Sequence, residues 1–319
     1  MTNFDVFNGD ADGICSLVQL RLAEPRQATL ITGVKRDIAL LSQVEAKAGD
    51  RITVLDISMQ KNQADLQRVL AAGAEVFYAD HHKAGDIPKH ANLDAHIDLR
   101  PTACTALIIN RYLQQQFALW AVTAAFGDNL ENSALALAQE LDLTADTNAL
   151  LKELGLYLNY NGYGTAIEDL FFHPAELYRA CVEFASPIDF VQQNTEVFGT
   201  LQDGYHADMS RAEQLKLFHH TSHVTAIMLP DEAWARRVSG VFGNELSNRH
   251  PDRAHAIITP KGGDYVVSIR APQNRLQGAD EIASQFPTGG GRKGAAGINQ
   301  LPEASIPQFL DAMSQYYDH

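Results

Sequence analysis

Acidic residues and imidazoles recur near the start of the chain at positions where a metal site could form. The run Asn8-Gly9-Asp10-Ala11-Asp12-Gly13 comes first, Asp56 follows, and Asp80-His81-His82 comes third. Several carboxylates that meet without counter-charge repel one another, so such a site needs cations or raised pKa values. A ligand set of carboxylates and imidazoles suits Mn²⁺, and these three groups contain no cysteine thiolate that would favour structural zinc. An ion held in this way can generate hydroxide near neutral pH and bind a phosphoryl oxygen.

Each of these groups directly follows a strand-like run. Such runs occupy residues 4–7, 29–32, 52–55 and 75–78, and helical segments such as 14–22 and 62–72 separate them. This alternation predicts βαβ units and a parallel sheet. Ligands of parallel sheets gather beyond the carboxyl ends of the strands, so we expect the three groups to meet at one edge. Taken alone, residues 8–13 also suit an ordinary turn and helix cap, and the ordered conjunction of the groups favours a site.

The length of 319 residues suits two lobes, and the predicted fold class is α/β. Residues 1–190 would form a parallel-sheet catalytic domain, on which the helical pattern of 105–183 makes a cap. Periodicity is lost around residues 186–212, and we place a linker at 191–218. Residues 219–319 show β-like runs, a short helical pattern and the segment Gly289-Gly290-Gly291, which predict a smaller α/β domain. The active-site cleft is expected between the two domains.

The charge distribution limits the ligands of the N-terminal lobe. The net charge is -14, and residues 1–204 hold 14 Lys and Arg against 27 Asp and Glu. Such a surface repels long polyanions, so we expect no long duplex nucleic acid as a partner, whereas divalent cations suit it. No run of about 18 apolar residues occurs, so no membrane partner is expected. The three cysteines are scattered, which suits reduced thiols in a cytoplasmic protein.

Together, these motifs resemble the DHH phosphoesterase family, named for the triplet that stands here as Asp80-His81-His82. Asp128, within residues 125–129, resembles the fourth motif of that family. Residues 268–270, 279–283 and 289–297 resemble its DHH-associated domain. The resemblance implies that His82 contacts the scissile phosphate and that Asp80 orients an imidazole. It implies a metal ligand set of Asp10, Asp12, bridging Asp56, His81 and Asp128.

Two residues depart from the family pattern. Val6 stands where many members carry a histidine ligand, so Asn8 could supply an oxygen instead, or that ion could bind weakly and arrive with substrate. Arg292 stands in place of the histidine of a GGGH-type motif, which favours a terminal phosphate as ligand. Arg100 is a further candidate phosphate contact, with a turn or capping role as the alternative. The implied substrate-binding residues of the tail are Ser268, Arg270, Gly289, Gly290, Gly291 and Arg292.

The resemblance is strongest to the nanoRNase branch. It implies a phosphodiesterase that uses one or two Mn²⁺ ions, with Mg²⁺ or Co²⁺ as substitutes, to hydrolyse short linear oligonucleotides to 5′-mononucleotides. Linear dinucleotides such as pGpG, the product of cyclic di-GMP breakdown, are the expected substrates. The alternatives are a single-strand-specific exonuclease, a cyclic-dinucleotide phosphodiesterase, and a catalytically inactive nucleotide-binding regulator, which Val6 and Arg292 motivate. Cleavage direction, base preference and oligomeric state stay open.

Overall fold

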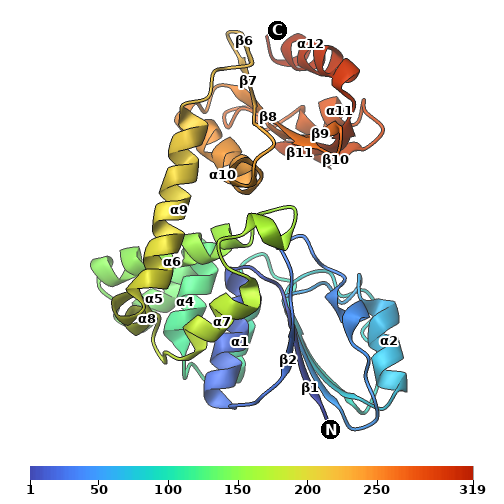
Figure 1. The fold of residues 1–319 in the computed structure, drawn as a ribbon, viewed down its shortest axis with the longest axis vertical. Helices are drawn as coiled ribbons and strands as arrows, with labels where there is room; N and C mark the ends of the chain where they lie inside the picture. Colours follow the sequence, from blue (N-terminus) through green and yellow to red (C-terminus); the bar gives the residue numbers. More distant parts are fainter. Residues whose placement is uncertain (319) are drawn as a thin grey trace. The chain divides into compact units, whose positions relative to one another are not determined.

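The structure, a computed structural model, describes residues 1–318 and divides into two compact units (Figure 1). The first unit spans Met1–Tyr205, and the second begins at His206. Each unit is built around its own sheet, so the expected α/β class is confirmed. No helix in the described part of the chain is long and apolar enough to span a bilayer.

The sheet of the first unit has five strands, all parallel, in the order β2-β1-β3-β4-β5. Its strands are apolar and mostly buried because helices cover both faces. Helix α1 packs on one face and helix α2 on the other (Figure 1). The bounds of these elements are β1 Asn3–Phe7, α1 Ala11–Ala23, β2 Thr29–Ile31, β3 Arg51–Leu55, α2 Gln63–Ala71, β4 Glu75–Asp80 and β5 Leu93–Ile97.

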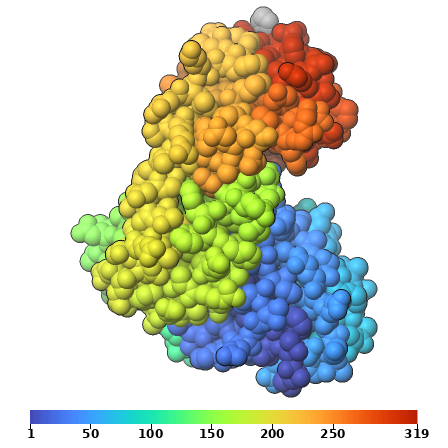
Figure 2. Space-filling model, in the orientation of Figure 1, coloured from blue at the N-terminus to red at the C-terminus, as the bar shows by residue number. Residues whose placement is uncertain are grey.

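A layer of further helices packs against α1, as the pattern of residues 105–183 predicted. In the space-filling view, yellow-green residues of this layer lie beside blue residues from the N-terminal part of the chain (Figure 2). Gly155 on α6 allows close approach to α4, because an added Cβ would collide with the carbonyl oxygen of Thr123. The layer comprises α3 Thr105–Tyr112, α4 Ala118–Gly127, α5 Glu131–Glu140, α6 Ala145–Asn161, α7 Pro174–Val182 and α8 Pro187–Gln193.

The segment expected to be an irregular linker, 191–218, is mostly helix α9, Thr195–Glu213. Gly199 and Gly204 interrupt the sequence pattern there, since glycine is a poor helix former. Gly204 lies against the ring of Phe171, and a side chain at that position would collide with the ring. Tertiary packing thus outweighs the low local helix propensity.

The second unit holds a six-stranded mixed sheet in the order β10-β11-β9-β8-β7-β6. Strands β7 and β8 are parallel, and the other pairs are antiparallel. Helices α11 and α12 share its main core with β7, β8, β9 and β11. The bounds are β6 His219–His220, β7 Val224–Met228, α10 Ala233–Arg249, β8 Ala254–Lys261, β9 Asp264–Arg270, α11 Ala279–Ala283, β10 Gly289–Arg292, β11 Ala295–Leu301 and α12 Ile306–Tyr317.

Candidate metal centre

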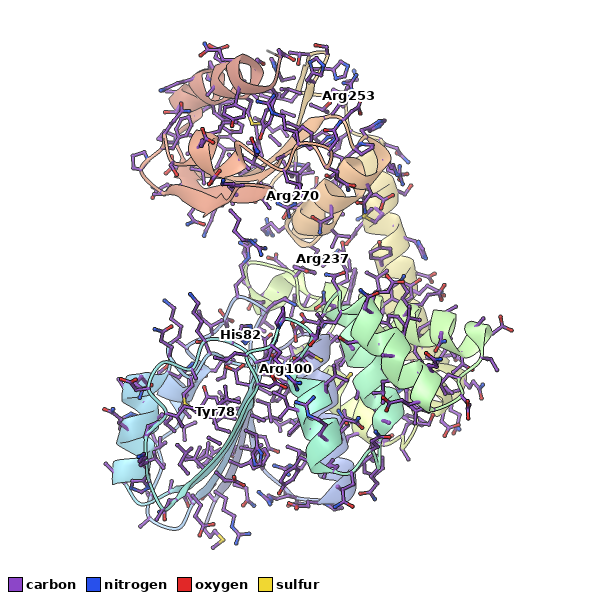
Figure 3. The ribbon with its side chains drawn as sticks, turned by 180° about the vertical axis from the view of Figure 1, so that it is seen from behind. Tyr78, His82, Arg100, Arg237, Arg253 and Arg270 are labelled. Atoms are coloured by element: carbon purple, nitrogen blue, oxygen red, sulfur yellow. The ribbon has the colours of Figure 1, made fainter. Side chains whose placement is uncertain are left out.

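The acidic and imidazole motifs lie at the carboxyl ends of three neighbouring strands. Asn8 follows β1, Asp56 follows β3, and Asp80 is the last residue of β4. Because β1, β3 and β4 are adjacent and parallel, the loops that follow them share one edge of the sheet. His82 and Arg100 lie toward this end of the sheet, and Tyr78 lies further back along β4 (Figure 3).

His81 is at the centre of the cluster. Its Nε2 lies 3.4 Å from Asp56 Oδ1 and 3.8 Å from both Asp12 Oδ2 and Asp128 Oδ2. Among the described residues, two sets of three offer ligand atoms that all lie within 4.8 Å of one another. One set is Asp56, His81 and His82, and the other is Asp12, His81 and Asp128.

Asp56 is held in a strained backbone conformation at the end of β3. Its φ is +59°, a left-handed value that few non-glycine residues adopt and that is common at functional sites. The Asp56 amide donates a hydrogen bond to the Ala79 carbonyl (3.1 Å), and Thr105 Oγ1 donates to Asp56 Oδ1 (3.1 Å). These contacts fix the carboxylate next to His81.

Asp12 lies in the first turn of α1, and the N-terminus of α3 orients it. The amides of Thr105 and Ala106 each donate a hydrogen bond of 2.7 Å, one to each carboxylate oxygen of Asp12. A helix N-terminus favours negative charge, which stabilises this fully buried carboxylate. Each oxygen keeps a further lone pair, so Asp12 can still bind a cation.

Asp10 and Asn8 have other partners. Asp10 caps α1, because its Oδ1 accepts hydrogen bonds from the amides of Asp12 (3.0 Å) and Gly13 (3.1 Å). The Asn8 Oδ1 accepts from the Asp10 amide (3.2 Å). Neither of the two ligand sets found within residues 1–318 contains Asp10. Val6 on β1 is one of the two residues that depart from the family pattern. It is fully buried in the core on the α2 side of the sheet and offers no ligand atom.

Lys35 is a site residue that the sequence reading missed. It follows β2, and its Nζ lies 2.5 Å from Asp10 Oδ2, 2.9 Å from Asn159 Oδ1 and 3.6 Å from Asp128 Oδ1. The sequence did carry one signal, because Lys35 follows the strand-like run of residues 29–32. In the sheet this strand, β2, lies next to β1, which precedes the motif of residues 8–13. Acids and imidazoles at strand ends indicate a metal site, whereas a lysine at a strand end does not.

The carboxylates of the centre carry unequal pKa shifts. Burial, followed by the charges of Asp12 and Asp10, raises the pKa of Asp56 well above its usual value. Burial, and next the charge of Asp12, raises the pKa of Asp128 to about 6. Burial opposes ionisation of Asp10 as well, but the charge and hydrogen bond of Lys35, together with hydrogen bonds from Gly13 and Asp56, lower the pKa of that carboxyl. The donor set therefore fits a divalent cation, which would favour the ionised forms of Asp56 and Asp128.

Asp80 and His82 form a hydrogen-bonded pair beside the cluster. His82 Nδ1 lies 2.8 Å from Asp80 Oδ1, and this hydrogen bond raises the pKa of His82. Asp80 is completely buried, and its Oδ2 has no hydrogen-bond partner among the described residues. The side chain of His82 is 46% exposed, so the imidazole that Asp80 orients can reach a bound ligand.

The candidate phosphate ligands Arg100 and Arg270 are both engaged by neighbouring side chains. Arg100 donates two hydrogen bonds to the carboxylate of Asp98. Arg270 Nε donates to Asn244 Oδ1 (2.7 Å), and its Nη1 donates to Ser268 Oγ (2.9 Å). Figure 3 places Arg270 in the second unit and Arg100 in the first.

The remaining tail candidates lie on paired strands. The register places Arg270 opposite Ala295 and Ala295 opposite Arg292, so the two arginines share one face of the sheet, two strands apart. Ser268, Gly297 and Gly290 form the next such row. Gly289 has no room for a side chain, because a Cβ would collide with a backbone carbonyl of α11. Gly291 has a φ of +150°, a value that favours glycine.

Comparisons with solved structures define the fold. A manganese-bound exonuclease RecJ matches 100% of this chain and 90% of its own, with 16% identity and a TM-score of 0.61. PggH, a pGpG-specific phosphodiesterase from Vibrio cholerae, matches 100% and 99%, with 14% identity and a TM-score of 0.61. The DHH domain of a member of the s1p family of ribosomal proteins matches 99% and 86%, with 14% identity and a TM-score of 0.58. No family model and no curated protein matches the sequence. The chain thus has the fold of the DHH phosphoesterases, as its motifs predicted.

Proposed function

We propose that this protein is a divalent-metal-dependent phosphodiesterase that hydrolyses short linear oligonucleotides to 5′-mononucleotides. The observation that carries the proposal is the convergence of three aspartates on His81 from separate elements: Asp12 in α1, Asp56 after β3 and Asp128 after α4. The likeness in fold to RecJ and to PggH, whose described substrate is pGpG, supports phosphodiester chemistry. Linear dinucleotides such as pGpG are our preferred substrates.

The ion would be held by Asp12, Asp56, His81 and Asp128, and Mn²⁺ suits this mixture of carboxylate and imidazole. When bound, a divalent ion in such a site supplies hydroxide near neutral pH and stabilises charge on a phosphoryl oxygen. The protein's own contribution is to fix the donors, through the α3 amides on Asp12 and the Thr105 hydroxyl on Asp56. Donors fixed in advance reduce the reorganisation that the reaction requires.

His82 is assigned to the scissile phosphate. Its Nδ1 is hydrogen-bonded to Asp80, which leaves Nε2 as the ring nitrogen directed to the substrate. The raised pKa of His82 favours the imidazolium, in which Nε2 carries a proton and donates to a phosphate oxygen. Asp80 acts through His82 and is therefore a positioning residue.

The row of Arg270 and Arg292 supports a preference for linear substrates. The backbones of the two arginines are two strand spacings apart, which is about 10 Å across the sheet. Their long side chains can therefore both reach a single phosphate. The guanidinium binds phosphate oxygens bidentately, and a terminal phosphate offers more of them than a diester. Cyclic dinucleotides have no terminal phosphate.

The test compares Mn²⁺-dependent hydrolysis of pGpG, a longer single strand and cyclic di-GMP by the full chain. We expect pGpG to be cleaved fastest. Asp56→Asn should lower its rate by more than about 100-fold, because the residue is a direct ligand and even supporting residues of metal sites cost 10 to 100-fold. Asp86→Asn is the matched control, because Asp86 is exposed and lies in the loop after β4.

Three outcomes would contradict the proposal. Faster cleavage of long single strands would assign an exonuclease, and cleavage of the ring as fast as pGpG would assign a cyclic-dinucleotide phosphodiesterase. Tight nucleotide binding without turnover, unchanged in Asp56→Asn, would assign a nucleotide-binding regulator.

A further inference from the structure

The Lys35 ammonium lies in a pocket of oxygen atoms that resembles a cation site. Its three oxygen neighbours come from Asp10, which caps α1, from Asn159 on α6, and from Asp128 after α4. Two carboxylates and an amide oxygen are hard donors, the kind that Mg²⁺, Ca²⁺ and Mn²⁺ prefer. In this structure they surround a side-chain cation.

This pocket adjoins the ligand cluster around His81, and the two share one residue. Asp128 Oδ1 faces Lys35 Nζ at 3.6 Å, while Asp128 Oδ2 faces His81 Nε2 at 3.8 Å. The Asp128 carboxylate therefore lies between the Lys35 ammonium and the ligand cluster of His81, Asp12 and Asp56.

Several contacts hold Lys35 in place. Its backbone amide donates to the Gly162 carbonyl (2.9 Å), and Asn8 Nδ2 donates to the Lys35 carbonyl (3.2 Å). The ammonium also lies 5.7 Å from the centre of the Tyr163 ring, within the range of a cation–π contact. With 27% of its side chain exposed, Lys35 is an integral part of the site and not a surface lysine.

From this geometry we propose that Lys35 replaces one of two metal ions, so that the protein binds a single divalent ion at Asp12, Asp56, His81 and Asp128. The proposal rests on the metal site of the proposed function and adds its stoichiometry and the role of Lys35. A second divalent ion among Asp10, Asn159 and Asp128 would contact the ammonium and be repelled by it.

The test is metal stoichiometry. The full chain is stripped of metal, saturated with Mn²⁺ and freed of excess ion, and manganese per chain is measured by mass spectrometry. We expect one ion in the wild type, with the paramagnetic resonance spectrum of an isolated Mn²⁺. Lys35→Ala should bind two ions and show the spectrum of a spin-coupled pair.

Matched variants separate charge from folding. Lys35→Met keeps most of the side-chain length and removes the charge, so it should also bind two ions if Lys35→Ala fails to fold. Lys35→Arg keeps the charge and should bind one. Lys61→Ala removes an exposed lysine of the same unit and should bind one.

Two ions in the wild type, or no gain of an ion in both Lys35→Ala and Lys35→Met, would overturn the proposal. The readout needs no turnover, so it separates the two claims. An inactive protein with the expected stoichiometries would refute the proposed function and support the role of Lys35. An active wild type that binds two ions would support the proposed function and refute the role of Lys35.

Discussion

Without metal, the free energy of unfolding of the first unit should fall as pH rises. The pKa shift of Asp128 gives the size of this effect. Its pKa in the folded state is about 6, against an ordinary value of 3.8. Between these values the folded protein holds a proton that the unfolded chain releases, so stability falls as pH increases. A shift of about two units at 1.36 kcal/mol each corresponds to roughly 3 kcal/mol, lost between about pH 4 and pH 7.

The other shifted groups do not reverse this trend. The raised pKa of Asp56 acts in the same direction. His82 stabilises the fold below its ordinary pKa of 6.5, and that contribution is lost as pH rises through its higher folded-state pKa. The lowered pKa of Asp10 contributes stability that is present above 3.8 and stays constant from there upwards.

The assay uses the two tryptophans of the chain. Trp120 is buried in the first unit and Trp234 lies in the second, so Trp234→Phe leaves fluorescence that reports on the first unit alone. Urea unfolding in a chelator would be followed from pH 4 to pH 8, with Asp128→Asn as the comparison. At pH 7.5, Mn²⁺ at a concentration 100 times its Kd should raise the free energy of unfolding by about 2.7 kcal/mol. A free energy of unfolding that is flat or rises with pH, or an unchanged slope in Asp128→Asn, would contradict the effect expected of Asp128.

Three further substitutions probe separate parts of the first unit. His82→Gln should lower pGpG turnover by roughly 100-fold while manganese per chain is unchanged, because the residue is assigned to the phosphate; loss of the ion would instead make it a ligand. Arg21→Ala should lower the free energy of unfolding by about 3–5 kcal/mol in urea titrations, because it leaves Asp5 buried without its partner at 2.5 Å; a loss below 1 kcal/mol would contradict this. Gly155→Ala should cost about 1–3 kcal/mol in thermal unfolding by overpacking the contact between α4 and α6, and an unchanged Tm would show that the helices can separate at no cost.

Much of the first unit could be predicted from the sequence because its information is local. Strand-like runs followed by polar residues define βα units, and parallel order then places Asp56 and Asp80 on one edge. The helical layer over 105–183 was readable from its periodicity. The resemblance to DHH proteins named Asp12, His81 and Asp128, which the structure brings together.

Lys35 and α9 escaped prediction for different physical reasons. The Lys35 ammonium is hydrogen-bonded to Asn159, which lies 124 residues further along the chain, and no local sequence pattern predicts that contact. In α9, Gly199 and Gly204 conceal the helical period, and the helix forms because tertiary packing overrides propensity. The pairing of the glycine-rich segment with β11 is likewise a non-local property.

We propose that one divalent ion binds where three aspartates meet His81. Anomalous diffraction at the manganese edge, from crystals of the full chain grown with Mn²⁺, tests it most directly. We expect one strong peak within about 2.0–2.3 Å of donor atoms of Asp12, Asp56, His81 and Asp128. No peak at these four side chains, or a second manganese peak among Asp10, Asn159 and Asp128, would contradict this site.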